Sequence, residues 1–180
     1  MKLFTIGHSN HQFSRFVELL EASSIDMVID VRSLPRSRIN PQFDRETLER
    51  ALLPHGIEYA FAGQFLGGRP RDPGCYKARV LPAEGADYLH EVDYPEVMKR
   101  DWFRKGIERL VELTEDHTAT VMCSEENPAE CHRHHLIYKY LRDNYSEIDV
   151  RHIRGDGKVI GAGSILASVN PESLTQPSLF

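Results

Sequence analysis

Short, largely apolar runs of strand length alternate with amphipathic helical segments along most of this chain. Lys2–Ile6 and Met27–Val31 are runs of the first kind, and Phe13–Leu20 carries apolar residues at helical spacing. A repeated strand-then-helix order favours parallel strands joined by crossover helices that cover both faces of one sheet. We therefore predict an α/β fold: a mainly parallel sheet flanked by helices in a Rossmann-like, three-layer arrangement, followed by a C-terminal hairpin and tail.

The other segments fit the same scheme. Ser9 or Asn10 is expected to cap the first helix, and the glycine- and proline-rich stretch from Gly63 to Pro82 is expected to be a long surface loop. The remaining predicted elements are a helix over Phe43–Leu53, a strand over Ile57–Phe61, a helical stripe within Tyr94–Leu113, a strand over Ala119–Met122, a helix with the core face Leu136, Ile137, Tyr140 and Leu141, and a strand over Asp149–Ile153.

One α/β domain is predicted over residues 1–160. A chain of 180 residues with 41% hydrophobic content can bury a sizeable core without disulfides. Gly155-Asp156-Gly157 predicts a tight turn into a last strand at 158–160. After Ile160 the composition changes, and Glu172 is the one charged residue that follows. Residues 161–180 are therefore predicted to form a tail.

The chain is expected to be cytoplasmic, with reduced thiols and no membrane partner. It begins without a long apolar region or a small-residue cleavage site, and no segment approaches the length of a membrane span. Cys75, Cys123 and Cys131 form no Cys-x-x-Cys pair, which argues against a disulfide framework.

The charge is unevenly distributed. The formal net charge of -5 argues against a basic surface over the whole chain, yet residues 32–79 hold nine Lys or Arg and five Asp or Glu. Such a local excess of positive charge can bind a phosphate-bearing ligand while the chain as a whole stays acidic. An ordinary mixed-charge surface is the alternative interpretation.

Three polar turns are predicted to meet at one edge of the sheet. Gly7–Asn10, Arg32–Arg38 and Cys123–Arg133 each follow a predicted strand. The carboxyl ends of parallel strands share one side of the sheet, which is where open α/β sheets bind ligands. The three turns would therefore bring imidazole, guanidinium and thiol groups together.

The third turn contains the signals of a helix start. Asn127 is a good N-cap, Pro128 suits the first helical position, and Glu130 lies three residues after the cap. Cys131 is then expected in the first or second turn of the helix, where backbone amides attract anions and lower the pKa of a thiol. His132 and Arg133 are expected on the inward face, at the cleft.

These placements define the predicted site. Nucleophilic or acid–base roles are assigned to thiol, imidazole and carboxyl groups, and anion binding to cationic and small polar groups. The predicted catalytic residues are Cys123, Cys131, His132, His8 and Glu125, and the predicted substrate- or anion-binding residues are Arg32, Ser37, Arg38, Arg133, Ser9 and Asn10. His134 and His135 are expected on the helix flank, outside the site, and His152 on a strand.

Other interpretations of the two cysteines stay open. Cys123, Cys131 and His132 could together hold a metal, although the spacing is not that of a zinc finger and adjacent helical residues point in different directions. Either cysteine could instead be a small buried hydrophobe. A Cys-x5-Arg phosphatase loop is excluded, because Arg133 follows Cys123 by ten residues and Cys131 by two. The sequence itself requires no cofactor.

The last residues resemble a docking peptide. Gln176, Leu179 and Phe180 match the short Gln-x-x-Leu-Phe peptide with which bacterial repair and replication proteins bind the DNA-polymerase sliding clamp, with Pro177 at a position where Leu is often found. A Leu-Phe pair is a suitable pocket anchor. A tail that is disordered or packs on its own domain is the alternative.

An ordered set of motifs resembles one known family. The motifs are Gly7-His8-Ser9-Asn10, Asp30-Val31-Arg32-Ser33 with Ser37-Arg38 and Asn40-Pro41, Leu66-Gly67-Gly68, and Met122-Cys123-Ser124-Glu125 with Cys131-His132-Arg133. In this order they are similar to those of the family called domain of unknown function 488. The resemblance implies a bacterial or archaeal cytoplasmic α/β domain and no settled activity. It directs attention to His8, Arg32, Ser37, Arg38, Cys123, Glu125, Cys131, His132 and Arg133.

The leading functional prediction is an enzyme, a Cys/His-dependent hydrolase or transferase, that acts on a phosphate-containing substrate. That substrate would be a nucleotide or nucleic acid, and the role DNA maintenance. The alternatives are a non-catalytic nucleic-acid-binding module recruited through the C-terminal peptide, and a metal-dependent protein with Cys and His ligands.

Overall fold

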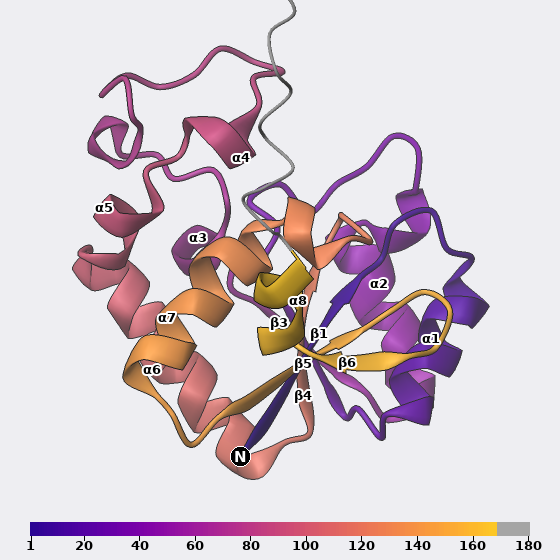
Figure 1. Cartoon of the computed structure of the whole chain (residues 1–180). Helices are drawn as coiled ribbons and strands as arrows, with labels where there is room; N and C mark the ends of the chain where they lie inside the picture. Colours follow the sequence, from indigo (N-terminus) through magenta and orange to yellow (C-terminus); the bar gives the residue numbers. More distant parts are fainter. Residues whose placement is uncertain (169–180) are drawn as a thin grey trace, which may run out of the picture.

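The computed structural model describes residues 1–168 and is built around one sheet flanked by helices (Figure 1). The sheet has six strands in the order β3-β2-β4-β1-β5-β6. Strands β1 to β5 pair in parallel, and β6 runs antiparallel to β5. This confirms the predicted α/β class and the C-terminal hairpin. The strands are β1 (Lys2–Gly7), β2 (Met27–Asp30), β3 (Glu58–Phe61), β4 (Ala119–Cys123), β5 (Asp149–Ile153) and β6 (Val159–Gly161).

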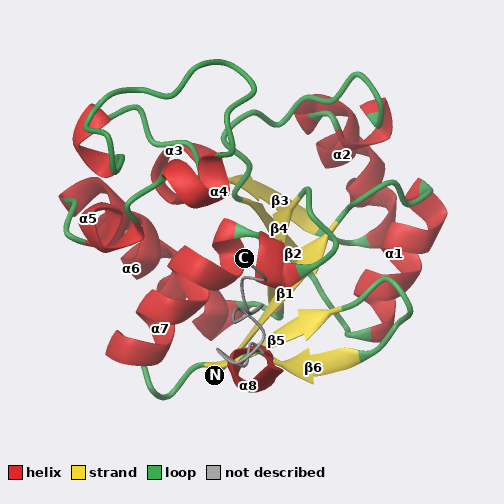
Figure 2. Ribbon diagram, turned by 45° about the horizontal axis from the view of Figure 1, so that its top comes forward, coloured by secondary structure: helices red, strands yellow, loops and turns green. Residues whose placement is uncertain are grey.

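Helices cover both faces of the sheet (Figure 2). One face packs against α1 (Phe13–Ala22) and α2 (Arg45–Leu52), and the other against α6 (Asp101–Asp116) and a helix formed by a π-helical segment, Arg133–Tyr138, that runs into α7 (Lys139–Asn144). The shorter helices are α3 (Gly63–Leu66), α4 (Tyr88–Glu91), α5 (Tyr94–Met98) and α8 (Gly163–Ser168), with 3₁₀ turns at Pro41–Phe43, Leu53–His55, Pro73–Cys75 and Pro128–Glu130.

The strand side chains alternate between two cores. Val28 packs with α1 and α2, whereas Met27 and Ile29 pack with α6. Both faces of the central strands are covered, so β2 and β4 are buried along their whole length. This two-sided burial explains why their sequences are nearly continuous apolar runs.

The strand order sets the position of the site. β4 lies between β1 and β2, with Gly7 paired to Cys123 and Asp30 to Met122 at the ends of the strands. The three polar turns that follow these strands therefore leave the sheet side by side, as the sequence predicted.

The glycine-rich stretch from Gly63 to Pro82 is not the surface loop that was predicted. It contains α3 and a 3₁₀ turn, and Leu66, Cys75 and Tyr76 are buried in the core. The Tyr76 hydroxyl donates to the carbonyl of Pro70 at 2.6 Å, and this hydrogen bond holds the chain against the domain. Glycine and proline here mark changes of direction within a packed segment.

Two other local predictions are corrected. Gln12, without a side-chain hydrogen bond, precedes α1, so neither Ser9 nor Asn10 is its cap. Ser9 instead has a positive φ of 46°, which turns the chain away from β1. The predicted helical stripe from Tyr94 to Leu113 is divided into α5 and α6.

The C-terminal boundary predicted at Ile160 falls inside β6. The turn before this strand contains Gly157 with a φ of 91°, a left-handed conformation that favours glycine. Beyond the hairpin, Ala162 and Ile165 are buried against the domain. Within residues 1–168, no helix has the length and apolar character needed to cross a membrane.

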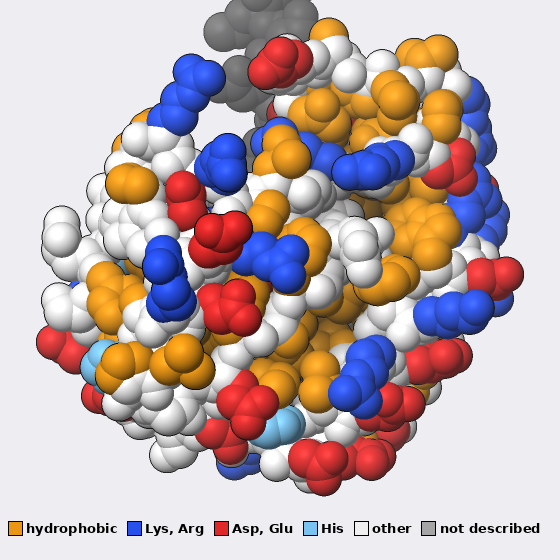
Figure 3. Space-filling model, turned by 180° about the vertical axis from the view of Figure 1, so that it is seen from behind, with side chains coloured by type: hydrophobic (Ala, Val, Ile, Leu, Met, Phe, Trp, Pro, Cys, Tyr) orange, Lys and Arg blue, Asp and Glu red, His pale blue; other side chains and the backbone are white. Residues whose placement is uncertain are grey.

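A largely apolar groove of about 560 Å³ lies between the edge strand β3, α3 and α6. Apolar side chains gather on this rear face, with Lys and Arg side chains beside them (Figure 3). Tyr59 and Phe61 of β3 line one side of the groove, and Lys105 and Arg109 of α6 lie on the other.

Candidate functional site

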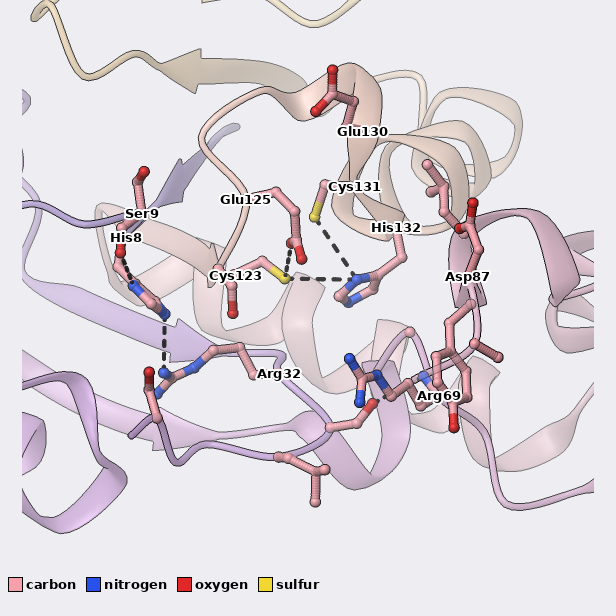
Figure 4. Close-up of a pocket in the computed structure, with 18 of the residues that line it drawn as sticks. His8, Ser9, Arg32, Arg69, Asp87, Cys123, Glu125, Glu130, Cys131 and His132 are labelled. Atoms are coloured by element: carbon pink, nitrogen blue, oxygen red, sulfur yellow. Dashed lines mark hydrogen bonds between the residues drawn. The ribbon is translucent and has the colours of Figure 1, made fainter. Parts of the chain in front are cut away.

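The three polar turns meet around a cleft of about 850 Å³ at the carboxyl edge of the sheet (Figure 4). Its floor is formed by His8, which follows β1, by Arg32, which lies just beyond β2, and by Cys123 at the end of β4. Its far wall is formed by the segment around α4. The predicted site residues that line it are His8, Ser9, Asn10, Arg32, Ser37, Cys123, Glu125, Cys131 and His132.

Cys131 lies immediately before the helix. The prediction that it lies in the first or second helical turn is wrong. Asn127 caps only the short 3₁₀ turn Pro128–Glu130, and the backbone of Cys131 is then extended, with φ -138° and ψ 141°. The Cys131 carbonyl accepts hydrogen bonds from the backbone N–H groups of His134 and His135, and its Sγ accepts one from the N–H of Arg133 at 3.5 Å. These are the bonds of an N-cap, so Cys131 itself caps the helix.

The two sulfur atoms and one imidazole form a compact cluster. His132 Nδ1 lies 3.7 Å from Cys123 Sγ and 3.8 Å from Cys131 Sγ, and all three atoms lie within 4.8 Å of one another. The expectation that Cys131 and His132 point in different directions is therefore wrong. It assumed that both residues are helical, whereas the extended backbone at Cys131 turns its side chain toward the same space (Figure 4).

Glu125 completes the cluster on the side of β4. The thiol of Cys123 donates a hydrogen bond to Glu125 Oε2 at 3.0 Å. A Cβ atom at Gly7 would collide with the backbone carbonyl of Glu125, so glycine is required where β1 passes this loop. The close approach of the two backbones fixes the position of the carboxylate-bearing loop.

The sulfur atoms have opposite acid–base tendencies. Burial opposes ionisation of Cys131, but the interaction with Cys123 and the positive charge of His132 lower the pKa of Cys131 well below its usual value. The interaction with Cys131, followed by burial, raises the pKa of Cys123. Burial lowers the pKa of His132, but the neighbouring Cys131 thiolate outweighs this effect and raises it.

A second buried network crosses the floor of the cleft. Arg32 binds the Asp30 carboxylate through Nε at 3.0 Å and Nη2 at 2.6 Å, and its Nη1 donates to His8 Nε2 at 3.1 Å. The Tyr59 hydroxyl donates to the same carboxylate at 2.7 Å. The positive charge of Arg32 is thus compensated by Asp30 within the protein.

His8 is held in one tautomer by this network. Because arginine only donates hydrogen bonds, His8 Nε2 accepts, and Nδ1 donates to the carbonyl of Ser9 at 2.8 Å. Burial and the charge of Arg32 lower the pKa of His8 to about 4. The ring stacks on Phe43, with 4.4 Å between ring centroids. His8 is therefore neutral at pH 7 and positions Arg32.

The cationic side chains of the cleft differ from those predicted. Arg36 and Arg69 line the cleft, whereas Arg38 is exposed and lies outside its lining. The Arg69 guanidinium lies 4.5 Å from the centroid of the Tyr88 ring, a cation–π contact. The sequence does not single out Arg36, because adjacent loop arginines are indistinguishable without the backbone conformation. It does not single out Arg69 either, because the pattern around it predicts a surface loop.

Arg133 has no part in the lining of the cleft. It is completely buried, and its guanidinium donates to the backbone carbonyls of Glu125 and Glu126, the second at 2.7 Å. Its position two residues after Cys131 suggested an anion ligand. The structure instead uses this arginine to hold the loop that follows β4.

The cleft also has residues that the sequence did not indicate. Some of them, Ser33, Leu34, Ser124 and Glu130, lie within two of the predicted turns, and Asn40 and Gly68 lie within the motifs noted in the sequence, but none was assigned a role. The others come from a segment without a chemical motif, which only the packing of α4 and α5 over the sheet brings to the site: Ala86, Asp87, Tyr88, Leu89, His90 and Tyr94.

His134 is buried beneath the helix and not on its flank, contrary to the prediction. Its Nδ1 lies 3.1 Å from His152 Nε2, and His152 Nδ1 lies 2.7 Å from Thr5 Oγ1. Burial is the main cause that lowers the pKa of His134 to about 4 and that of His152 to about 3. This pair lies outside the cleft lining, and His152 lies on β5 as predicted. Gln176, Leu179 and Phe180 of the predicted docking peptide lie outside the described residues.

Comparison with known proteins identifies one family. Residues 12–140 match the family model described as "Domain of unknown function DUF488". No curated protein and no solved structure gives a significant match. The matched segment begins just before α1 and ends in the helix that carries His132, so it includes most of the cleft. The family match covers well over half of the chain and agrees with the motifs noted in the sequence, and the chain therefore belongs to the DUF488 family.

Proposed function

We propose that this chain is an enzyme, a Cys/His-dependent hydrolase or transferase, that acts on a phosphate-containing substrate. The observation that carries the proposal is the Cys123–Cys131–His132 cluster at the floor of a cleft whose walls bear Arg36 and Arg69. Reactive and anion-binding groups thus face one space that is large enough for a nucleotide.

The arginines of the walls suit a phosphate ligand. Among residues 1–168, neither Arg36 nor Arg69 has a carboxylate partner at ion-pair distance, so both are free to pair with an external anion. Arg32 is held by Asp30, Phe43 and His8 through four of its five N–H groups. The remaining N–H on Nη1 adds one directed donor at the floor.

Turnover of phosphate esters is the direct test. Nucleotides, single-stranded DNA and duplex DNA are incubated with the wild-type protein and with Cys131→Ser. Cys75→Ser is the matched control, because Cys75 is a buried cysteine outside the cleft. We expect turnover that Cys131→Ser abolishes and Cys75→Ser retains. Equal turnover by wild type and Cys131→Ser would contradict the assignment of the cluster.

The anion-binding part is tested separately. Arg36→Gln and Arg69→Gln are expected to raise KM roughly 10-fold each, the effect of losing one charge-assisted hydrogen bond, and to change kcat little. Binding of DNA that falls steeply with salt, without turnover of any of the three substrates, would favour a non-catalytic binding module instead.

For the DNA maintenance role, we propose that Gln176, Leu179 and Phe180 recruit the protein to the sliding clamp. The support is the resemblance of the sequence from Gln176 to Phe180 to clamp-binding peptides. Removing these five residues should abolish pull-down of the clamp and leave the thermal unfolding midpoint unchanged. Clamp binding by the truncated chain would rule this recruitment out.

A further inference from the structure

We infer that Cys123, Cys131 and His132 form a zinc-binding site that opens onto the cleft. Thiolate sulfur and imidazole nitrogen are the ligands that zinc prefers, and two sulfurs with one nitrogen make a common catalytic set. The three ligand atoms lie within 4.8 Å of one another and come from two separate elements, the end of β4 and the start of the helix.

The distances fit one tetrahedral ion. With Zn–S bonds of about 2.3 Å and Zn–N bonds of about 2.0–2.1 Å, tetrahedral angles place sulfur and nitrogen about 3.5–3.6 Å apart. The observed distances from His132 Nδ1 are 3.7 Å to Cys123 Sγ and 3.8 Å to Cys131 Sγ. The same geometry places two zinc-bound sulfur atoms about 3.8 Å apart. The two sulfur atoms lie within 4.8 Å of each other, so they would approach by up to about 1 Å when the ion binds.

Neighbouring groups hold the ligands in this arrangement. The N–H of Arg133 donates to Cys131 Sγ, as backbone amides do to metal-bound thiolates. A Cβ atom at Gly68 would lie 2.7 Å from His132 Nδ1, so the backbone of Gly68 packs directly against the ligating edge of the ring. These contacts support Cys131 and the Nδ1 edge of His132, whereas His132 Nε2 is buried without a hydrogen-bond partner among residues 1–168.

Glu125 lies beside the cluster, next to the Cys123 ligand. Its Oε2 is 3.0 Å from Cys123 Sγ, and it lines the cleft together with the three ligands. Three protein ligands and one open position are typical of catalytic zinc, whereas structural sites use four protein ligands. We assign Glu125 as the general base for a water molecule at the fourth position.

This catalytic role rests on the proposed function. The water gives one proton to Glu125 and attacks phosphorus, so one P–O bond forms while the P–O bond to the leaving group breaks. The leaving oxygen then takes the proton from Glu125. One water is consumed, and no electrons are transferred.

Metal content measures the site independently of activity. The full chain is purified without added metal, analysed for bound ions by mass spectrometry, and titrated with Zn²⁺ and with Co²⁺, whose tetrahedral thiolate complexes absorb visible light. We expect one equivalent of metal per chain. Cys123→Ser, Cys131→Ser and His132→Asn should each lower zinc affinity by more than about 100-fold, beyond the loss seen for outer-shell partners.

Two further variants make the result decisive. Cys75→Ser, in the core outside the cleft, should bind zinc as the wild type does, and Glu125→Gln should bind zinc but lose turnover. Absence of a Co²⁺ spectrum in the folded wild type, or the same spectrum in Cys131→Ser, would overturn the zinc site.

The two proposals fail separately. Turnover that depends on Cys131 in protein that binds no zinc would overturn the zinc site and support a cysteine nucleophile. Stoichiometric zinc without turnover of any phosphate ester would overturn the proposed function and support the site.

Discussion

The buried pair of His134 and His152 makes the stability of the fold depend on pH in a calculable way. Both rings are almost completely buried and hydrogen-bonded to each other, and burial lowers their pKa values from the ordinary 6.5 to about 4 and about 3. In the unfolded chain both rings take up a proton near pH 6.5. Between pH 6 and pH 4.5 the unfolded state therefore binds more protons than the native state.

The sign and size follow from this difference. The contribution of the pair is fully present above pH 6.5 and is lost as the pH falls toward the native pKa values. Each ring lowers the free energy of unfolding by about 1.4 kcal/mol per pH unit in this window, so the pair lowers it by about 2.7 kcal/mol per unit. At pH 5, protonation of each ring in the unfolded chain lowers the free energy of unfolding by about 2 kcal/mol relative to its value above pH 7.

Urea unfolding at closely spaced pH values between 7.5 and 4.5 measures this slope. His152→Gln removes one titrating ring and should reduce the slope by about 1.4 kcal/mol per pH unit, whatever its effect on stability at pH 7.5. His55→Gln, at an exposed position, is the matched control. The same slope in wild type, His134→Gln and His152→Gln would refute the description of the pair as buried and neutral.

Three further substitutions test how the cleft is supported, each by the free energy of unfolding in urea. Gly7→Ala places a methyl group against a backbone carbonyl of the loop after β4 and should cost about 3 kcal/mol or more, whereas Gly161→Ala, with open space around it, should cost less than about 1 kcal/mol. A lysine at position 133 cannot donate to both carbonyls that the guanidinium binds, so Arg133→Lys should lower the free energy of unfolding by about 2–4 kcal/mol. An unchanged free energy would show that the loop keeps its position without this side chain. Tyr59→Phe removes a hydrogen bond to the Asp30 carboxylate and should cost roughly 1.5–3 kcal/mol, and an unchanged value would show that Arg32 alone satisfies this group.

The sheet and its ligand edge could be predicted because their signals are local. Continuous apolar runs identify the central strands, and parallel pairing then places the turns after Gly7, Asp30 and Cys123 on one side. Only the pattern of apolar residues and the strand-then-helix order are needed to place these turns. Neither depends on the conformation of a loop.

The details of the site could not be predicted, because they depend on loop conformation and on distant packing. The cap signals at Asn127 belong to a single 3₁₀ turn, and nothing in the sequence shows that the chain extends again before the helix. Which of Arg36 and Arg38 faces the cleft depends on the path of one loop. The burial of His134 depends on its meeting His152, a partner on a different element.

The π-helical segment Arg133–Tyr138 has a consequence for how the chain tolerates insertion and deletion. A π-turn spans five residues between hydrogen-bonded groups where an α-turn spans four, so this segment contains one residue more than an α-helix of the same rise needs. Deleting one residue would allow an ordinary α-helix that still packs α7 on the sheet. Every position before the deletion would then turn by about 100° around the helix axis. The side chains of Cys131 and His132 would then no longer face Cys123, although the apolar residues of α7 would still pack on the sheet. The extra residue therefore sets the direction in which the start of this helix faces the end of β4.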